Sequence, residues 1–421
     1  MFKYQRSEFT PKFITRIAEG YAWGDLRADA LAGLTVAIVA LPLSMAIAIA
    51  SGLGPERGLY TAIVGGFLVS LLGGSRYQIG GPAGAFIVLV SACVGQIGLQ
   101  GVILATLLSG AMLMALGLVR AGNLIRLIPH AVTLGFSAGI AVIIFVSQIK
   151  DLTGITLPHD APEVAQKLAL LWAARGSVSP AALGLALAVI AAIVALRRFA
   201  PRWPSLLLAV VGAGLAAFAF GLPVETIYAR FGDLPRSPPA PHLPLMSPDL
   251  LRAALPWAVQ FTLLGAIESL LSAVVADSMS GRKHRPNIEL VAQGVANVGS
   301  ALFGGFCVTG TIARTATNVR AGARGPMAGM LHALFVLVFL AVAAPLAGYI
   351  PLAALAGVLA VVAWNMAEKA EIWHLMRSNP WQGIVVVITF ACVILWDLTT
   401  GIFIGTALAA LPNVLAKRRA G

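Results

Sequence analysis

The sequence predicts an all-α polytopic membrane protein, and composition, hydropathy and the length of the apolar runs support this prediction. Hydrophobic residues make up 59% of the 421-residue chain and charged residues only 11%, whereas an ordinary soluble domain holds roughly 25% charged residues. The mean hydropathy is +0.89. Apolar runs recur between residues 29 and 416, many of them near the ~20 residues that a helix needs to cross a bilayer.

Charged residues, prolines and glycines divide these runs into fourteen candidate membrane segments. In the first half they cover about residues 29–53, 57–73, 82–96, 99–119, 127–149, 178–196 and 203–221. In the second half they cover about residues 254–276, 288–304, 310–321, 325–345, 350–365, 381–397 and 400–416. Two longer polar connections interrupt them, one over residues 150–177 and a proline-rich one over residues 222–253.

The basic residues predict the orientation of the chain. Residues 1–28 are charged and amphipathic and lack a short apolar core with a cleavage site, so we expect a cytoplasmic segment and no removable signal peptide. If each segment crosses once from there, 20 of the 29 Lys and Arg residues fall at cytoplasmic positions. Both termini are therefore expected inside. The pI near 10.2 then reflects membrane topology, and nucleic acid is not an expected partner.

The third and tenth segments share a plan. The stretches "LLGGSRYQIGGPAGAFIVL" (residues 71–89) and "ALFGGFCVTGTIARTATNV" (residues 301–319) each show an apolar helix ending in Gly-Gly, an extended link, and a short helix opened by glycine. With seven segments per half, the second copy inserts upside down, which makes a 7+7 inverted repeat. Such paired, glycine-interrupted segments indicate the midplane binding site of a transporter, although they also occur as packing devices.

Arg314 lies in the first turn of the helix expected in the tenth segment. An arginine at the bilayer centre costs ~2.5–3.5 kcal/mol, and the N-terminal end of a helix already carries positive charge. Pro82 opens a second helix that points inward from the third segment. Two opposed helix N-termini and a guanidinium group predict an anion site. Hydroxyl donors could come from Thr309, Thr311, Thr315 and Ser91, whereas Arg320 is expected to extend to the cytoplasmic face.

Glu268 is the carboxylate deep in the apolar run "TLLGAIESLLSAVV" (residues 262–275). It either forms a structural ion pair with Arg314 or takes up a proton beside the bound anion, which would couple anion entry to a proton gradient. Asp277 and Asp397 lie near segment ends and are expected to cap helices or face solvent. For His332, in the middle of a segment, packing is favoured over a proton relay.

The sequence does not support an enzyme. "GFSAG" (residues 135–139) matches a nucleophile elbow, but it lies inside an apolar helix and is better interpreted as a close helix-packing face. The cysteines Cys93, Cys307 and Cys392 are far apart without metal-ligand spacing and are expected to be buried thiols. With no HExxH, CxxC or phosphate loop, we expect neither an enzyme nor a metal or cofactor site.

Two blocks, residues 40–90 ("ALPLSMAIAIASGLGPERGLYTAIVGGFLVSLLGGSRYQIGGPAGAFIVLV") and residues 266–322 (from "AIESLLSAVVADSMSGRKHRPNIEL" to "TGTIARTATNVRAG"), resemble the sulfate permease (SulP) anion transporters, bacterial relatives of the solute carrier 26 proteins. The resemblance implies the inverted repeat shared with uracil permease and an elevator movement. It also implies a core domain over residues 29–122 and 254–345, a gate domain over residues 123–221 and 346–416, and an anion held between the third and tenth segments.

We place the anion-binding site on Arg314 and the residues that open the two half-helices, with Glu268 as the proton-coupling residue. The predicted substrate-binding residues are Arg314, Thr311, Gly310, Thr315, Ala83, Gly84, Ala85 and Leu43. Some relatives carry a polar Gln at the position of Leu43, and its absence weakens a sulfate assignment. Sodium-dependent bicarbonate members carry Asp at the position of Glu268, so the longer carboxylate favours proton coupling or exchange.

The resemblance also implies a cytoplasmic STAS domain after the last segment. The final residues "AKRRAG" are too few to form one, which leaves a natural short form and a truncation both open. A homodimer is suggested by the family.

We expect a secondary active transporter for small anions in the bacterial inner membrane, a proton-coupled symporter that prefers dicarboxylates such as fumarate or succinate over bicarbonate and sulfate. An anion exchanger, a sodium-coupled bicarbonate or sulfate transporter and, less favoured, an anion channel remain alternatives.

Overall fold

The computed structural model describes residues 8–123, 129–157, 164–201, 203–237, 240–244, 246–396 and 398–420, with side chains up to residue 412. Five residues considered in the sequence analysis lie outside the described residues. They are Asp397 and the basic residues Lys3, Arg6, Arg126 and Arg202.

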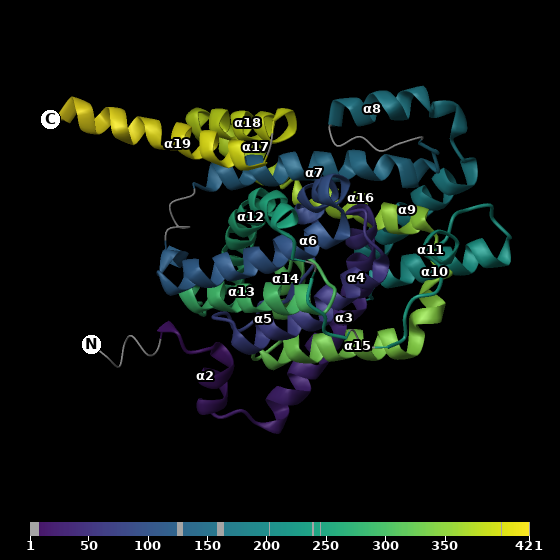
Figure 1. The fold of residues 1–421 in the computed structure, drawn as a ribbon, viewed down its shortest axis with the longest axis horizontal. Coiled ribbons are helices and arrows are strands. Elements are labelled where there is room, and N and C mark those ends of the chain that lie inside the picture. The colour runs from purple at the N-terminus through teal and green to yellow at the C-terminus, as the bar shows by residue number, and fades with distance from the viewer. Residues whose placement is uncertain are drawn as a thin grey trace.

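Helices dominate the described chain (Figure 1). The first half contains α2 (Lys12–Ala18), α3 (Trp23–Ala50), α4 (Pro55–Tyr60), the π-helical turn η1 (Thr61–Gly65), α5 (Gly66–Leu72), strand β1 (Gly80–Gly81), the 3₁₀ turn η2 (Gly84–Phe86), α6 (Ile87–Leu118), α7 (His130–Thr153), α8 (Val164–Ala173), the 3₁₀ turn η4 (Arg175–Ser177), α9 (Pro180–Phe199), α10 (Ser205–Ala219) and α11 (Ile227–Phe231). The second half contains α12 (Pro248–Ser280), α13 (Pro286–Leu302), strand β2 (Thr309–Gly310), α14 (Ile312–Arg320), α15 (Met327–Ala347), α16 (Leu352–Met366), α17 (Lys369–Ser378), α18 (Pro380–Leu395) and α19 (Leu398–Ala420).

Within the described residues, each of the fourteen predicted segments overlaps a helix. Seven helices of the described chain are long and apolar enough to cross a membrane, namely Trp23–Ala50, Gly84–Leu118, His130–Thr153, Pro180–Phe199, Pro248–Ser280, Met327–Ala347 and Leu352–Ser378. Further apolar helices are shorter, such as Ser205–Ala219 and Pro380–Leu395. A multi-pass helical protein is therefore found, while the number of fourteen crossings stays a prediction.

The boundary between the third and fourth predicted segments is a break inside α6. Gly98 has φ 68° and ψ −176° within this otherwise helical stretch, and a positive φ is a conformation that glycine adopts without steric cost. The two polar connections differ from expectation, because the first contains α8 and the second contains α11. Short helices in such links satisfy backbone groups that would otherwise need water.

Several helices begin with the same local signal. Ser179, Ser247 and Asn379 each precede a proline at the first helical position of α9, α12 and α18. Each cap side chain accepts a hydrogen bond from a backbone N–H in the first turn, at 3.1–3.3 Å. A short polar side chain satisfies a free N–H there, and proline at this position lacks the N–H that would be unpaired.

The helices pack in two groups. The core group consists of α3–α6 and α12–α15, in which α6 packs on α12 and α13, and α15 packs on α3. The gate group consists of α7, α9, α10 and α16–α19, in which α7 packs on α16 and α18, and α9 packs on α10 and α16. In Figure 1, α5, α13 and α15 lie in the lower half of the view and α7, α17 and α18 in the upper half. The names of the two groups refer to this packing alone, and the predicted core and gate domains stay a prediction.

The two extended links meet inside the core group as a short antiparallel ladder. Gly80 pairs with Gly310 and Gly81 pairs with Thr309. Asn297 of α13 holds the second link, because its amide donates to the Val308 carbonyl at 2.8 Å and accepts from the Val308 N–H at 3.1 Å. Buried backbone groups at membrane depth need such partners within the protein. The ladder therefore fixes the positions from which the two half-helices start.

Candidate anion-binding site

Two helices begin at the two ends of this ladder. After β1, the turn η2 starts at Gly84 and leads into α6, and after β2, α14 starts at Ile312 with Thr311 as its N-cap. The first N–H groups of a helix have no partner within the helix and carry its positive end. The backbone therefore presents two N-terminal helix ends within one region of the core group.

Arg314 lies in the first turn of α14 and is buried, with 1% of its surface exposed. Its Nη2 donates to Ser44 Oγ at 3.1 Å and to the Pro82 carbonyl at 3.3 Å. Its Nε and Nη1 are buried without an acceptor among the described residues. Because a buried, charged donor without an acceptor costs ~1–3 kcal/mol or more, this guanidinium is suited to an anion that supplies the missing oxygens.

A cavity of about 280 Å³ lies between the core and gate groups and contains this arginine. From the core group it is lined by the predicted residues Leu43, Ala83, Gly84, Ala85, Glu268, Thr311 and Arg314, together with Val39, Ile47, Pro82, Ile312, Ala313 and Thr317. From the gate side it is lined by Ser137, Arg197, Leu206, Val362, Asn365, Met366 and Glu368. The fold thus brings together most of the predicted site residues.

Two predicted substrate-binding residues do not line this cavity. Thr315 is fully buried, and its Oγ1 accepts from the Ile79 N–H at 3.1 Å and lies 3.0 Å from Ser272 Oγ. Gly310 faces Gln78, so that an added Cβ would lie 1.4 Å from Gln78 Nε2. Thr315 binds the link, and Gly310 leaves room for a side chain that supports it. Neither residue is placed to contact an occupant of the cavity.

Of the predicted hydroxyl donors, one lines the cavity and the others do not. Thr311 lines the cavity, and its N–H donates to the Ile79 carbonyl at 3.0 Å. Thr309 donates to the Gly265 carbonyl at 3.3 Å, and Ser91 lies outside the cavity lining. Helix rotation decides which hydroxyl faces the cavity, and the sequence does not specify that rotation.

Glu268 faces the same cavity and is 8% exposed. Within the described part of the chain, its carboxylate forms neither a hydrogen bond nor an ion pair, and no ion pair connects it with Arg314. The structural ion pair considered above is therefore absent from this arrangement. A carboxylate beside the cavity without a fixed partner remains free to respond to what the cavity holds.

Gly81 gives the guanidinium of Arg314 its room. A Cβ added at Gly81 would lie 2.1 Å from Arg314 Nη1, much closer than a real contact. Since Gly81 is also a ladder residue, the backbone itself forms the wall beside the arginine. The glycine pair after Ile79 thus serves close approach of backbone to the site.

Sequence reasoning missed Ser44, which binds Arg314, and the polar residues on the gate side of the cavity, Ser137, Arg197, Asn365 and Glu368. Ser137 belongs to "GFSAG", which was interpreted as a packing face. That interpretation is confirmed for the glycines, because Cβ atoms at Gly135 and Gly139 would clash with Val386 and Val393 of α18. The signal in the sequence that could have identified Ser137 is its position as a polar residue between two packing glycines.

The remaining predicted residues have structural surroundings. Cys93, Cys307 and Cys392 are buried free thiols, as expected. Asp277 binds the loop after α12, because its Oδ2 accepts from the His284 N–H at 3.0 Å. His332 is fully buried, and neither ring nitrogen has a partner among the described residues. No group of three or more metal-ligating side chains occurs in the described ranges.

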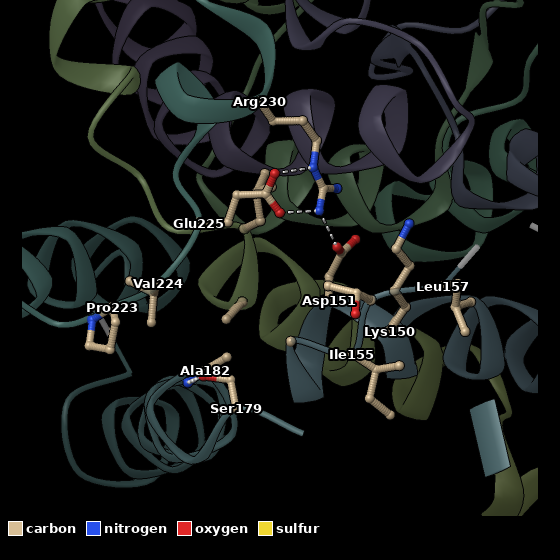
Figure 2. A pocket seen from close by; sticks show the side chains of 14 residues that line it. Lys150, Asp151, Ile155, Leu157, Ser179, Ala182, Pro223, Val224, Glu225 and Arg230 are labelled. Atoms are coloured by element: carbon tan, nitrogen blue, oxygen red, sulfur yellow. Dashed lines mark hydrogen bonds and ion pairs between the residues drawn. The ribbon is translucent and has the colours of Figure 1, made fainter. Parts of the chain in front are cut away.

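A second cavity, of about 500 Å³, lies at the C-terminal end of α7 and is lined by Lys150, Asp151, Glu225 and Arg230 among others. Figure 2 shows Arg230 between the two carboxylates. Its Nε donates to Glu225 at 2.9 Å and its Nη2 to Asp151 at 3.0 Å. Because two carboxylates already satisfy this arginine, the cluster anchors the proline-rich connection to α7 and lacks the unpaired guanidinium of the first cavity.

Comparison with known proteins agrees with this architecture. The model of the sulfate permease family matches residues 26–389. YvdB of Bacillus subtilis (strain 168), whose name suggests sulfate transport, is 40% identical over 400 residues, which cover 93% of this chain and 74% of that protein. The bicarbonate transporter BicA of Synechocystis sp. (strain ATCC 27184 / PCC 6803 / Kazusa) is 31% identical over 406 residues, which cover 93% of this chain and 70% of that protein.

Solved structures show the same fold. The transmembrane domain of a cyanobacterial bicarbonate transporter BicA superposes with a TM-score of 0.81 and 30% identity, covering 90% of this chain and 98% of that domain. The murine anion transporter Slc26a9 superposes with a TM-score of 0.86 and 19% identity, covering 99% of this chain and 72% of that one. These relatives are transporters, in keeping with the exclusion of an enzyme. The chain therefore belongs to the sulfate permease family of membrane anion transporters.

Proposed function

We propose that this protein is a secondary active transporter that carries a dicarboxylate, of the size of fumarate or succinate, across a bacterial inner membrane together with a proton. The anion would bind between the N-terminal ends of η2–α6 and α14, against Arg314. Thr311, Ala83, Gly84, Ala85 and Leu43 would complete the core side of the site, while Gly310 and Thr315 support it from behind.

The observation that carries this proposal is the state of Arg314. It is a buried cation whose Nε and Nη1 nitrogens lack acceptors among the described residues, and it lines a cavity. Transfer of a charge from water into such a site is favourable only when hydrogen-bonding partners of opposite charge replace the lost water. The cargo would supply that charge, which makes binding depend on an anion.

Glu268 supports proton coupling. It lies on the same cavity, and no described residue forms an ion pair with it. With the cavity empty, an ionised Glu268 balances the cation. An anion entering the cavity would repel that charge, and a proton on Glu268 removes the repulsion. Anion and proton would then occupy the cavity together, as symport requires.

The position of the cavity between the two helix groups supports an elevator movement. Arg314, Glu268 and the half-helix ends belong to the core group, whereas α7, α9, α10 and α16 of the gate group form the opposite wall. Displacement of one group against the other would open this interface first at one side of the membrane and then at the other. The residue limits 29–122 and 254–345 for the core domain and 123–221 and 346–416 for the gate domain belong to this proposal.

Sodium-coupled transport of bicarbonate is the second candidate, and the similarity to BicA favours it. Sodium coupling would require oxygen ligands around the ion. The cavity offers Glu268 and Thr311 for that purpose. The two candidates differ in the driving ion and in the charge of the cargo, so that one experiment distinguishes them.

The experiment is uptake of labelled succinate, fumarate, sulfate and bicarbonate into proteoliposomes, with proton and sodium gradients imposed separately. We expect an inward proton gradient to concentrate dicarboxylate. Arg314→Ala should abolish uptake of every transported anion, whereas Arg320→Ala, an exposed arginine in the last turn of the same helix, should retain it. Size-exclusion profiles of both variants check that folding is preserved.

Unchanged uptake by Arg314→Ala would refute the site. Accumulation driven by sodium alone, with bicarbonate as the cargo, would refute proton–dicarboxylate symport and select the second candidate.

A further inference from the structure

A second arginine faces the cavity from the opposite helix group. Arg197 lies in the last turn of α9 and lines the cavity that holds Arg314. Within the described ranges it forms no ion pair. Its neighbour Arg198 lies in the same helical turn but outside the cavity lining. The positive-inside rule explains a pair of arginines here, but it does not explain why one of them faces the cavity.

The residues that line the cavity differ in exposure to solvent. Arg314 and Thr311 are buried, whereas Arg197, Asn365 and Glu368 are exposed. Apolar residues also line it, among them Leu43, Ile47, Leu206 and Val362. The lining thus combines a buried cation, an exposed cation and apolar side chains. This distribution matches a short molecule with a negative group at each end and an apolar centre.

The charges of the lining agree with such an occupant. Two guanidinium groups and two helix N-termini of about half a charge each face the cavity, and Glu368 offsets one of these charges. If Glu268 carries its proton, about two positive charges remain. An anion with two negative charges would therefore leave the loaded cavity close to neutral, which a site at membrane depth requires.

We propose that Arg197 contacts the second anionic group of the cargo and so makes the site selective for dianions. This inference rests on the proposed function, because it assumes that the first anionic group binds Arg314. Beyond the proposed function, it assigns to the gate group, through Arg197, a part in binding the cargo. Selectivity would then arise from two cations on different helix groups, which a small monoanion cannot contact at the same time.

Glu368 allows a second prediction, in which a substitution strengthens the binding of dianions. Glu368 lines the same cavity, is exposed, and forms no ion pair with Arg197 among the described residues. Its backbone is left-handed, with φ 40° and ψ 43°, which is unusual for a residue with a side chain. A carboxylate held there repels the outer anionic group. Removing its charge should therefore favour dianions.

The test measures apparent Kd values of succinate and bicarbonate from the thermal stabilisation of the purified 421-residue chain at increasing ligand concentration. We expect Arg197→Gln to raise the Kd of succinate about fivefold, the effect of a partly exposed ion pair of about 1 kcal/mol. The Kd of bicarbonate should change by less than about twofold, because a small monoanion bound at Arg314 does not also contact Arg197. Arg197→Lys should restore part of the affinity, and Glu368→Gln should lower the Kd of succinate.

Arg198→Gln is the matched control and should leave both Kd values at the wild-type level. Equal effects of Arg197→Gln and Arg198→Gln, or equal weakening of succinate and bicarbonate, would overturn the proposal, as would a wild-type protein that binds bicarbonate alone. Loss of binding in Arg314→Ala with no effect of Arg197→Gln would reject this inference and leave the proposed function standing. Binding that survives Arg314→Ala would reject the proposed function itself.

Discussion

Two buried glutamates show how surroundings assign different roles to one residue type. Glu289 accepts hydrogen bonds from the Gly74 N–H at 2.8 Å, the Ser75 N–H at 3.0 Å and Gln293 Nε2 at 2.9 Å. It binds the link between α5 and β1 to α13 and has a structural role. Glu268 has no such partners within the described chain and faces the cavity. A buried carboxylate that nothing holds ionised is the better candidate for gaining and losing a proton.

For Glu268→Gln we expect the loss of proton-driven accumulation with retention of exchange. The amide has the shape of a protonated carboxyl group but cannot release a proton, so anion binding persists while coupling is lost. Counterflow of labelled against unlabelled substrate in proteoliposomes, without a proton gradient, measures the exchange. A variant that still concentrates substrate under an inward proton gradient would exclude the coupling role.

For Gly81→Ala we expect weaker anion binding in a folded protein. The added methyl group would lie 2.1 Å from Arg314 Nη1, so the guanidinium must shift from its present position. Gly95→Ala serves as the control, because a Cβ there meets nothing within 4 Å. A Kd for succinate in Gly81→Ala equal to that of Gly95→Ala would contradict the close approach described here.

At the scale of elements, helix positions were more predictable than the links between helices. Apolar runs and proline or glycine boundaries mark α3, α7 and α12, since these signals are local in sequence. The β1–β2 ladder joins residues about 230 positions apart, from Gly80 to Gly310, and glycine-rich stretches alone do not specify a partner. Asn297 of α13 and Gln78 of the first link support the ladder, but neither carries a signature that would distinguish it from other polar residues.

The proline-rich connection yields a prediction at this scale. Arg230→Ala should lower the stability of the connection by about 1 kcal/mol, since it removes a partly exposed ion cluster with Asp151 and Glu225. Limited proteolysis between residues 222 and 247 should become faster, while transport remains. Arg236→Ala, an exposed arginine of the same connection, is the control. Equal cleavage rates for the two variants would show that the cluster in Figure 2 does not anchor the connection.

At the scale of the whole molecule, the arrangement of the peripheral helices can be compared with the predicted orientation in the membrane. In Figure 1, α2 and α19 lie on the left of the view, and α8 and α11 on the right. The predicted topology places α2 and the C-terminal end of α19 in the cytoplasm and α8 and α11 outside, with most basic residues inside. The structure arranges these elements at opposite ends without a membrane present.

This topology predicts a pattern of labelling. In intact cells, a membrane-impermeant maleimide should react with Arg236→Cys in the external connection and should reach Arg282→Cys only after permeabilisation. Both positions are exposed, and the native cysteines are buried, which keeps the background low. Labelling of Arg282→Cys in intact cells would reverse the proposed orientation.

The sequence by itself determined the all-α membrane fold, the paired third and tenth segments, and the candidacy of Arg314 and Glu268 as charges deep in apolar segments. These follow from hydropathy, from glycine and proline, and from the cost of charge in a bilayer, all of which act within a short stretch of chain. Only the tertiary structure decided that Glu268 and Arg314 share a cavity without pairing, that Thr315 faces away from it, and that Arg197 faces into it. Those outcomes depend on how each helix is rotated and packed against segments far away in the sequence, and hydropathy does not specify that geometry.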